Sequence, residues 1–225
     1  MKYLFCFFSF FFFIYNLNAE NNYLKVSFLP ELLPNAGYAA QPGLAGPYAG
    51  TDDDVLIVAG GANFPNEVPW KGGSKVYYDE IFILHKDGRE NCSWEKTDEK
   101  IPFQSAYGGA VSTPHGLLCF GGNTENKCIA DSWFINYVPE DETVQVVPGP
   151  SLPMPLTNFA FAEEGNTIFV AGGISETGGV SQKIFFSLDL SGTNPKTWKW
   201  EELPGWNGQP RAFAVGAVQS NGANN

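Results

Sequence analysis

Three short apolar runs, each ending in a pair of glycines, dominate the hydrophobic pattern of this chain. They occupy residues 55–61 (VLIVAGG), 116–122 (GLLCFGG) and 167–173 (TIFVAGG). Runs rich in β-branched and aromatic residues favour buried strands, and a glycine pair permits positive φ angles and the close approach of a second backbone. Three copies of one pattern predict a repeated structural unit built around these strands.

Each run lies within the same succession of segments. A Leu-Pro or Ile-Pro pair comes first, followed by a strand of small residues, a polar turn, the strand with the glycine pair, a loop, an aromatic strand and a last strand in which tryptophan recurs. Pro102 and Pro153 each lie 19 residues before the first glycine of their pair, and the first copy is lengthened by an insertion at 35–44. Four antiparallel strands in about 50 residues make one blade of a β-propeller. We therefore expect an all-β fold that needs no helix.

Three complete blades are expected between residues 43 and 202. The strands of the first should be 46–51, 55–59, 77–84 and 92–96. Those of the second should be 105–112, 117–120, 131–137 and 144–147. Those of the third should be 158–162, 167–171, 183–190 and 198–202. We expect alternating burial in the first strands and continuous burial in the second strands.

Both ends of the chain resemble single strands of incomplete blades. Residues 23–30 resemble a last strand and its exit, and residues 209–218 resemble a first strand. Propellers have about 4 to 8 blades, so these features predict a truncated ring. In this interpretation 20–42 is a closing strand and loop, and 43–225 is a partial propeller. The uncovered faces of its outer blades would favour self-association.

Residues 1–19 form a segment of another kind. Lys2 precedes the apolar run 3–15, and a short polar stretch leads to the small residue Ala19. This pattern is typical of a secretory signal peptide, because about 13 apolar residues are fewer than the ~20 that a membrane-spanning helix needs. We expect the mature protein to begin near Glu20, to be periplasmic or secreted, and to have no membrane span after cleavage.

The charge and the cysteines exclude several classes of function. The formal net charge is −11, and no basic cluster offers a footprint for nucleic acid, which we do not expect as a partner. The number of cysteines after residues 1–19 is odd, so at least one is unpaired within the chain. They are Cys92, Cys119 and Cys128. Two histidines and no Cys-x-x-Cys spacing make a zinc site improbable, and we expect neither a metal nor another cofactor.

Several motifs resemble known families. The glycine-pair strands, the spaced tryptophans and the aromatic third strands resemble the kelch repeat. A more specific set resembles the cyclically permuted branch of the N-acetylneuraminate epimerase, or sialic acid mutarotase, family. These motifs are 43–50 (GLAGPYAG), 56–65 (LIVAGGANFP), 69–73 (PWKGG) and 77–81 (YYDEI). The resemblance implies a six-bladed, exported isomerase that interconverts the α and β anomers of N-acetylneuraminate, an acidic monosaccharide.

The resemblance also implies a catalytic glutamate after a glycine-pair turn, with an arginine six residues later. Ring opening and reclosure need a group that moves protons, and the sugar carboxylate needs a cation. Here the glycine pairs are followed by Ala62, Asn123 and Ile174, and no Glu-x5-Arg occurs. The catalytic residues are therefore unassigned, and we expect the pair to lie beyond Asn225. The alternatives are a non-catalytic kelch module that binds glycan or protein, and a product without activity.

Four residues are candidates for substrate binding. Arg211 opens a first strand, where its side chain could reach a central channel, or could serve as a surface charge. Asn63, Asn123 and Ser175 follow the glycine pairs, in loops that could bind sugar hydroxyls or simply form turns. Aromatic residues could pack between blades or stack on sugar. They are Trp94, Trp198, Trp200, Tyr77 and Tyr78.

Overall fold

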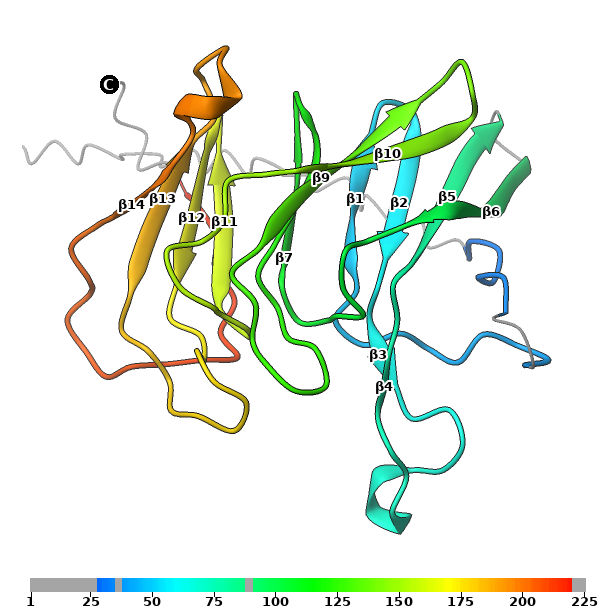
Figure 1. The fold of residues 1–225 in the computed structure, drawn as a ribbon, viewed down its shortest axis with the longest axis horizontal. Helices are drawn as coiled ribbons and strands as arrows, with labels where there is room; N and C mark the ends of the chain where they lie inside the picture. The colour runs from blue at the N-terminus through cyan, green and yellow to red at the C-terminus, as the bar shows by residue number, and fades with distance from the viewer. Residues whose placement is uncertain (1–27, 35–37, 88–90, 220–225) are drawn as a thin grey trace, which may run out of the picture.

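The computed structural model describes residues 28–34, 38–87 and 91–219. Over these ranges the strands form three four-stranded antiparallel sheets and one two-stranded hairpin (Figure 1). The helical residues of the same ranges are confined to two 3-10 turns, η1 (Pro69–Lys71) and η2 (Pro195–Thr197). The all-β propeller fold expected from the sequence is confirmed. The expected signal peptide lies outside the described residues.

Each sheet is one blade, with its strands in the order of the chain. Blade 1 contains β1 (Tyr48–Asp52), β2 (Val55–Ala59), β5 (Glu80–Asp87) and β6 (Asn91–Lys100). Blade 2 contains β7 (Gly109–Thr113), β8 (Gly116–Phe120), β9 (Ser132–Val138) and β10 (Thr143–Pro148). Blade 3 contains β11 (Ala160–Glu164), β12 (Thr167–Ala171), β13 (Phe185–Asp189) and β14 (Trp200–Glu202). The extra hairpin, β3 (Ala62–Asn63) and β4 (Val76–Tyr77), extends beyond blade 1.

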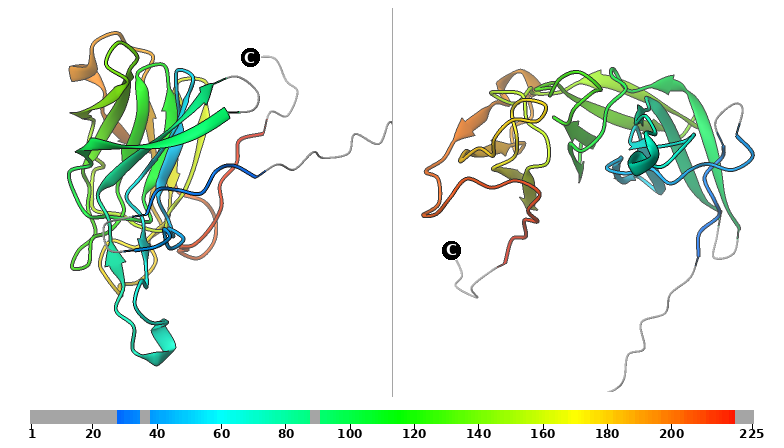
Figure 2. Two further views of the ribbon diagram at one scale, coloured as in Figure 1. Left: turned by 90° about the vertical axis from the view of Figure 1, so that its right-hand side faces the viewer. Right: turned by 90° about the horizontal axis from the view of Figure 1, so that it is seen from below.

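The blades follow one another along an open arc (Figure 2). The first strands β1 and β7 lie beside each other. The loops that follow the glycine pairs all lie at one end of the blades, at the bottom of Figure 1. We call this end the loop face. The β1–β2, β7–β8 and β11–β12 turns lie at the opposite end.

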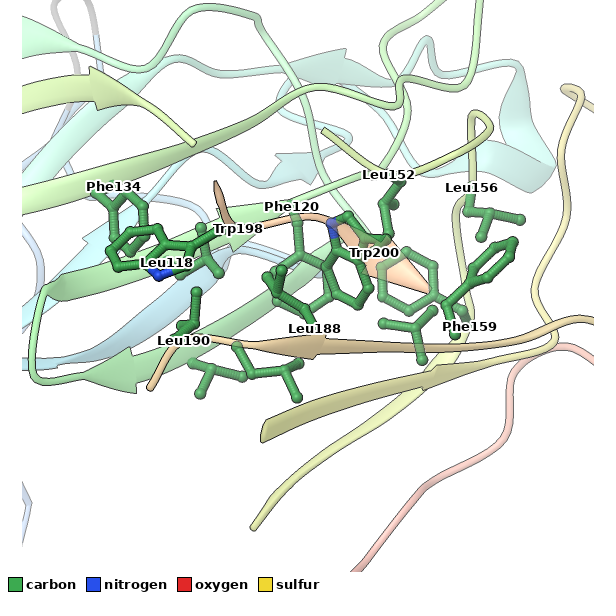
Figure 3. Packing of buried hydrophobic residues seen from close by; sticks show 14 residues of the cluster. Leu118, Phe120, Phe134, Leu152, Leu156, Phe159, Leu188, Leu190, Trp198 and Trp200 are labelled. Atoms are coloured by element: carbon green, nitrogen blue, oxygen red, sulfur yellow. The ribbon is translucent and has the colours of Figure 1, made fainter. Parts of the chain in front are cut away.

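Two apolar cores hold the arc together, one on each side of blade 2. The core between blades 1 and 2 includes Ile57, Leu117 and Trp133. The core between blades 2 and 3 includes Phe120 and the two tryptophans near the end of blade 3 (Figure 3). Those tryptophans, Trp198 and Trp200, are buried, so they serve inter-blade packing.

Continuous burial is found in only one of the three second strands. Every residue of β8 is buried, because neighbouring residues point alternately into the two cores. In β2 and β12, buried residues alternate with half-buried ones. The expectation of fully buried second strands is therefore wrong for blades 1 and 3. The physical reason is that, in the described part of the chain, each of these blades is covered by a neighbouring blade on one face only.

The first strands begin later than expected in every blade. The reason is a left-handed residue before each one, at Gly46 (φ 58°), Tyr107 (φ 63°) and Asn158 (φ 52°). Backbone N–H groups at these positions bond from blade to blade: Tyr107 donates to Gly46 (2.8 Å), and Asn158 donates to Tyr107 (3.0 Å). A positive φ in a residue other than glycine costs about 1–2 kcal/mol, which this repeated contact helps to offset.

Other expected strands differ in extent. Residues 77–84 are divided between β4 and β5, because the N–H of Tyr78 bonds to the Gly61 carbonyl rather than along blade 1. The last strand of blade 3 begins at Trp200 rather than at 198, after η2. At the N-terminal end, residues 28–30 are not in a strand, and 23–27 lie outside the described residues.

Residues 209–218 do not form the expected strand, although they occupy its place. The N–H of the second glycine in each pair bonds to a carbonyl at the start of the next unit. The bonds run from Gly61 to Ser105 (2.9 Å), from Gly122 to Leu156 (2.7 Å) and from Gly173 to Arg211 (2.9 Å). Phe213 likewise has positive φ and donates to the Asn158 carbonyl (2.8 Å). No second strand pairs with this segment in the described part of the chain, so it lacks a ladder.

Candidate functional site

The loop face carries a polar network that joins the three blades. Asn123 Nδ2 donates to the Tyr77 hydroxyl at 2.9 Å. The Thr157 hydroxyl lies 3.0 Å from Asn123 Oδ1 and 3.1 Å from the Tyr107 carbonyl oxygen. Tyr77 belongs to the hairpin of blade 1, Asn123 follows blade 2, and Thr157 precedes blade 3. This network fixes the loops of neighbouring blades relative to one another.

The two candidate asparagines are largely committed to contacts within the protein. Asn63 and Asn123 are each only 8% exposed. Asn63 Oδ1 accepts from the Tyr78 hydroxyl at 2.8 Å, and its Nδ2 donates to the Pro42 carbonyl at 3.4 Å. Burial raises the pKa of Tyr78, so this hydroxyl stays protonated and keeps donating. The adjacent tyrosines 77 and 78 thus connect the two asparagines.

Arg211 and Ser175 lie near each other but apart from the asparagines. Arg211 is exposed, and its guanidinium lies 5.8 Å from the centre of the Trp206 ring. Its backbone N–H bonds to the Gln182 carbonyl at 3.3 Å. The half-buried Ser175 hydroxyl accepts from Gln182 Nε2 at 3.1 Å. Ser175 therefore lies in the loop of blade 3 that follows the glycine pair, and Arg211 lies beside this loop at the start of the fourth unit.

A cleft opens on the loop face between the blade 1 hairpin and the loops of blade 2. Its volume is about 580 Å³, and its walls combine residues 74–77, 102–104 and 124–126. Lys75 and Tyr77 line one wall, and Phe103 and Glu125 line the others. The cleft is therefore amphipathic, with aromatic rings, hydroxyl and amide groups, and one cation on the hairpin side.

Lys75 is a residue that the sequence pattern did not reveal. Its Nζ lies 3.2 Å from the Tyr107 hydroxyl and 4.8 Å from the centre of that ring. The Phe64 and Tyr77 rings are also close, at 5.6 Å and 5.9 Å. Tyr107 precedes blade 2, far along the chain, so only the fold assembles this group. In the sequence, only the nearby aromatic residues Phe64 and Tyr77 could have indicated that Lys75 has a functional role.

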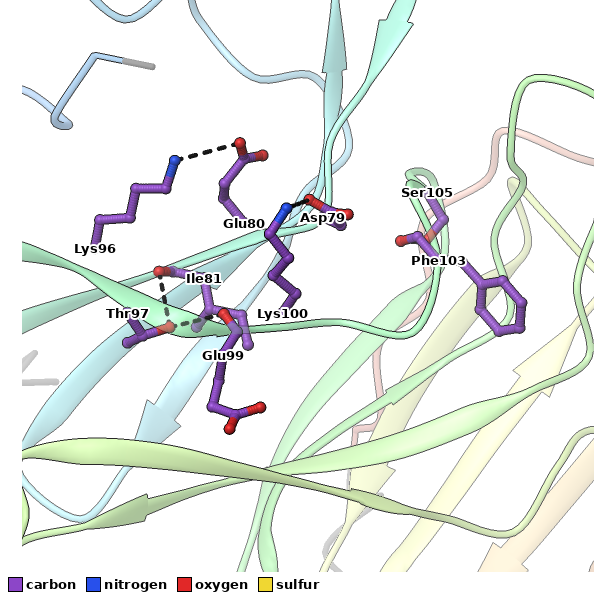
Figure 4. A network of polar contacts seen from close by, with 9 residues as sticks. All are labelled: Asp79, Glu80, Ile81, Lys96, Thr97, Glu99, Lys100, Phe103 and Ser105. Atoms are coloured by element: carbon purple, nitrogen blue, oxygen red, sulfur yellow. Dashed lines mark hydrogen bonds and ion pairs between the residues drawn. The ribbon is translucent and has the colours of Figure 1, made fainter. Parts of the chain in front are cut away.

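Two other lysines of blade 1 are paired with acids. Lys100 Nζ lies 2.8 Å from an Asp79 carboxylate oxygen, and Lys96 Nζ lies 3.3 Å from Glu80 (Figure 4). The hydrogen bond that Lys100 donates to Asp79 is the main cause that raises the pKa of Lys100. Among the described residues, Lys75 forms no ion pair with a carboxylate.

The cysteines of the described ranges do not belong to a metal site. The three thiols are free, and burial raises the pKa of both Cys119 and Cys128. In the ranges that the structure describes, no group of three or more His, Cys, Asp or Glu side chains could hold a metal ion. Within the same ranges, no helix is long and apolar enough to cross a membrane.

Comparison with known proteins identifies the relatives of this chain. No family model matches it. An N-acetylneuraminate epimerase of Brucella melitensis is 40% identical over 107 residues, which are 44% of this chain and 25% of the relative. The enzyme of that name from Haemophilus influenzae is 32% identical over 127 residues, or 52% of this chain and 32% of the relative. Over about half of its length, this chain is therefore similar to N-acetylneuraminate epimerases.

The sequence similarity covers only part of each relative. An N-acetylneuraminate epimerase of Escherichia coli is 31% identical over 142 residues, and the match spans 59% of this chain and 35% of that relative. The chain thus aligns with about a quarter to a third of the curated epimerases that it matches. The solved structure of YjhT superposes with a TM-score of 0.58 at 16% identity, covering 76% of this chain and 55% of that chain. This likeness supports the fold alone.

Proposed function

We propose that this chain is part of an N-acetylneuraminate epimerase and contributes surface that binds the acidic sugar. The observation that carries the proposal is the sequence identity to several relatives bearing that name, over 107 to 142 residues. The cleft on the loop face adds a chemical argument, because its hydroxyl groups, aromatic rings and cation suit a sugar acid. The names of the relatives favour this function over a non-catalytic kelch module that binds glycan or protein.

The resemblance implies that catalysis needs a glutamate with an arginine six residues later, and this chain does not contain that pair. Neither Arg89 nor Arg211 follows a glutamate by six residues. In the described part of the loop face, Tyr78 has a raised pKa, but its hydroxyl donates to Asn63 and is buried. We therefore assign sugar binding to this chain, and we assign proton transfer at the anomeric centre to the remainder of a whole epimerase.

A binding experiment tests the proposal. Saturation-transfer-difference NMR of N-acetylneuraminate with the purified chain is expected to show saturation of the sugar protons. Glucose serves as a neutral sugar control, and the Haemophilus influenzae epimerase serves as a positive control. A chain that melts cooperatively but transfers no saturation to N-acetylneuraminate contradicts the proposal.

We further propose that the protein is exported and acts in the periplasm or outside the cell. Support comes from the apolar run 3–15 and the small residue Ala19. N-terminal sequencing of the product from fractionated cells is expected to give a start near Glu20. A product in the cytoplasmic fraction that begins at Met1 contradicts this proposal.

A further inference from the structure

We infer that Lys75 is a carboxylate-binding residue of the cleft, and that the Tyr77 ring beside it is part of the wall against which an acidic sugar lies. The inference rests on the proposed function, which supplies the class of ligand. It concerns a residue outside the glycine-pair loops, where the sequence had placed the candidates. Its support comes from the geometry, the charge environment and the hydrogen-bond directions around the Nζ atom.

The geometry holds the ammonium group at the cleft rather than in open solvent. Lys75 is half-buried, and its Nζ lies within 6 Å of three ring centres, at 4.8 Å, 5.6 Å and 5.9 Å. Ring faces attract a cation, and partial burial strengthens that attraction. The same side chain lines the cleft. The lysine is thus positioned in advance, so that binding an anion costs little of its side-chain entropy.

Among the residues that the structure describes, this cation has no acidic partner. Lys71, Lys96 and Lys100 lie 3.8 Å, 3.3 Å and 2.8 Å from a carboxylate, whereas no such ion pair is formed by Lys75 in the described ranges. The protein carries 24 acidic and only 13 basic residues, so an unpaired, half-buried lysine stands out. A ligand carboxylate would complete the pair with charge-assisted hydrogen bonds.

The neighbouring hydroxyls are free to donate to a ligand. The Tyr107 hydroxyl oxygen accepts from Lys75 Nζ, and the Tyr77 hydroxyl oxygen accepts from Asn123 Nδ2. A phenol that accepts one hydrogen bond still has its own proton to donate. A carboxylate beside Lys75 could therefore receive bonds from an ammonium and from a phenol. Glu125, exposed on the opposite wall, is the one carboxylate lining the cleft and opposes the ligand charge.

Arg211 is a weaker candidate for this role. Its guanidinium is exposed and lies over a single ring, that of Trp206. An exposed cation gains little from pairing with an anion, because water and salt screen the interaction. Arg211 also does not line the cleft that holds Lys75.

The test compares N-acetylneuraminate with its methyl ester, which keeps the sugar and removes the charge. Dissociation constants for both are measured by NMR titration on the wild-type chain and on Lys75→Met, which keeps the apolar stem. The matched control is Lys127→Met, because Lys127 is exposed and lies 5.8 Å from the Phe103 ring on the same face. For each variant, the ratio of the dissociation constants of acid and ester is compared. This ratio does not change if a substitution lowers the fraction of folded protein, because both constants are affected equally.

The wild-type chain is expected to prefer the acid over the ester. Lys75→Met should weaken acid binding by about tenfold and leave ester binding unchanged, in line with the strength of hydrogen bonds to charged groups. Lys127→Met should keep the wild-type ratio, and Glu125→Gln should strengthen acid binding. Acid and ester that bind the wild type equally, or a Lys75→Met variant with the wild-type ratio, would overturn the inference and leave the proposed function intact. A wild-type chain that binds neither compound would overturn both.

Discussion

The indole Nε1 of Trp94 donates a 2.8 Å hydrogen bond to the carbonyl oxygen of Pro30. Trp200 makes the same bond, also of 2.8 Å, to Pro150, which follows the last strand of blade 2. Both tryptophans occupy the same register, because Trp94 pairs with Leu84 and Trp200 with Leu188. Pro30 thus stands where the exit of a preceding blade would stand. This relationship supports the interpretation of Pro30 as such an exit, whereas the strand expected before it falls mostly outside the described residues.

The first prediction concerns this tryptophan bond. Trp94→Phe keeps an aromatic ring but removes the donor, and should lower the free energy of unfolding by about 1 kcal/mol. Trp200→Phe should cost more, because its ring is also buried against Phe120, with centroids 5.6 Å apart. The control is Trp70→Phe, since Trp70 is 80% exposed. Urea unfolding measures all three, and equal stability of the Trp94 and Trp70 variants would contradict the assignment.

The second prediction concerns the glycine pair of blade 2. Gly122 has φ 103°, and a Cβ placed there would lie 2.4 Å from the Tyr48 hydroxyl and 2.7 Å from the Ala106 carbonyl oxygen. Gly122→Ala should therefore destabilise the chain by about 2–5 kcal/mol, through backbone strain and overpacking. Gly165 also has a positive φ, but no atom lies within 4 Å of a Cβ added there. Gly165→Ala therefore measures the backbone strain without the overpacking. Equal losses in the two variants, measured by denaturant unfolding, would refute the role of close packing.

The third prediction concerns pH and the turn between β1 and β2. Partial burial is the main cause that raises the pKa of Asp52, and the bond from the Tyr137 N–H (2.7 Å) partly opposes it. A raised folded-state pKa means that the folded state holds the proton more tightly than the unfolded state. Protonated Asp52 therefore contributes to the free energy of unfolding at low pH, and this contribution is lost as the pH rises through the folded-state pKa.

Replacing Asp52 removes that pH dependence. Asp52→Asn should raise the melting temperature relative to wild type at pH 7, and the gain should shrink as the pH falls below about 4, the ordinary aspartate pKa. Asp54→Asn, an exposed neighbour in the same turn, is the control. A gain for Asp52→Asn that stays constant between pH 7 and pH 3 would show that charge is not its cause.

The fourth prediction concerns self-association, which we propose for this chain. The face of blade 3 that points away from blade 2 bears an apolar groove of about 340 Å³, lined by Phe169, Phe185 and residues 216–218 among others. The equivalent face of blade 2 is covered by blade 3. Light scattering of the purified chain should therefore show species larger than a monomer, and Phe169→Ser should reduce them.

A surface control distinguishes association through this face from nonspecific association through exposed apolar residues. Val180 is 79% exposed in a loop of the same blade, and Val180→Ser should leave the association unchanged. A wild-type chain that stays monomeric and melts cooperatively would contradict the proposal. Equal effects of the two substitutions would also contradict it, because they would assign the association to exposed apolar residues in general.

The strands that end in glycine pairs were the most predictable part of the fold. β2 and β12 have the expected bounds, because a polar turn and a glycine pair delimit each run. The first strands were placed too early, because nothing in the sequence marks Tyr107 or Asn158 as left-handed. Local propensity disfavours that conformation in residues other than glycine, and the blade-to-blade backbone bonds override it.

The site was less predictable than the fold. Polar residues after the glycine pairs were expected to face a ligand, but Asn63 and Asn123 instead satisfy the hydroxyls of neighbouring tyrosines. Lys75 lies in the long insertion between β3 and β4, which breaks the repeat. Its contact with Tyr107 joins two blades, so the sequence pattern within a single unit could not indicate it.

The most direct test of the proposed function is a chimera in which the matching segment of the Haemophilus influenzae epimerase is replaced by the corresponding residues of this chain. Exchange between the α and β anomers of N-acetylneuraminate is measured by NMR exchange spectroscopy, with the intact relative and a buffer blank as references. The chimera is expected to accelerate the exchange well above the blank. A chimera that melts cooperatively yet leaves the exchange at the uncatalysed rate would contradict the assignment of this chain to a working epimerase.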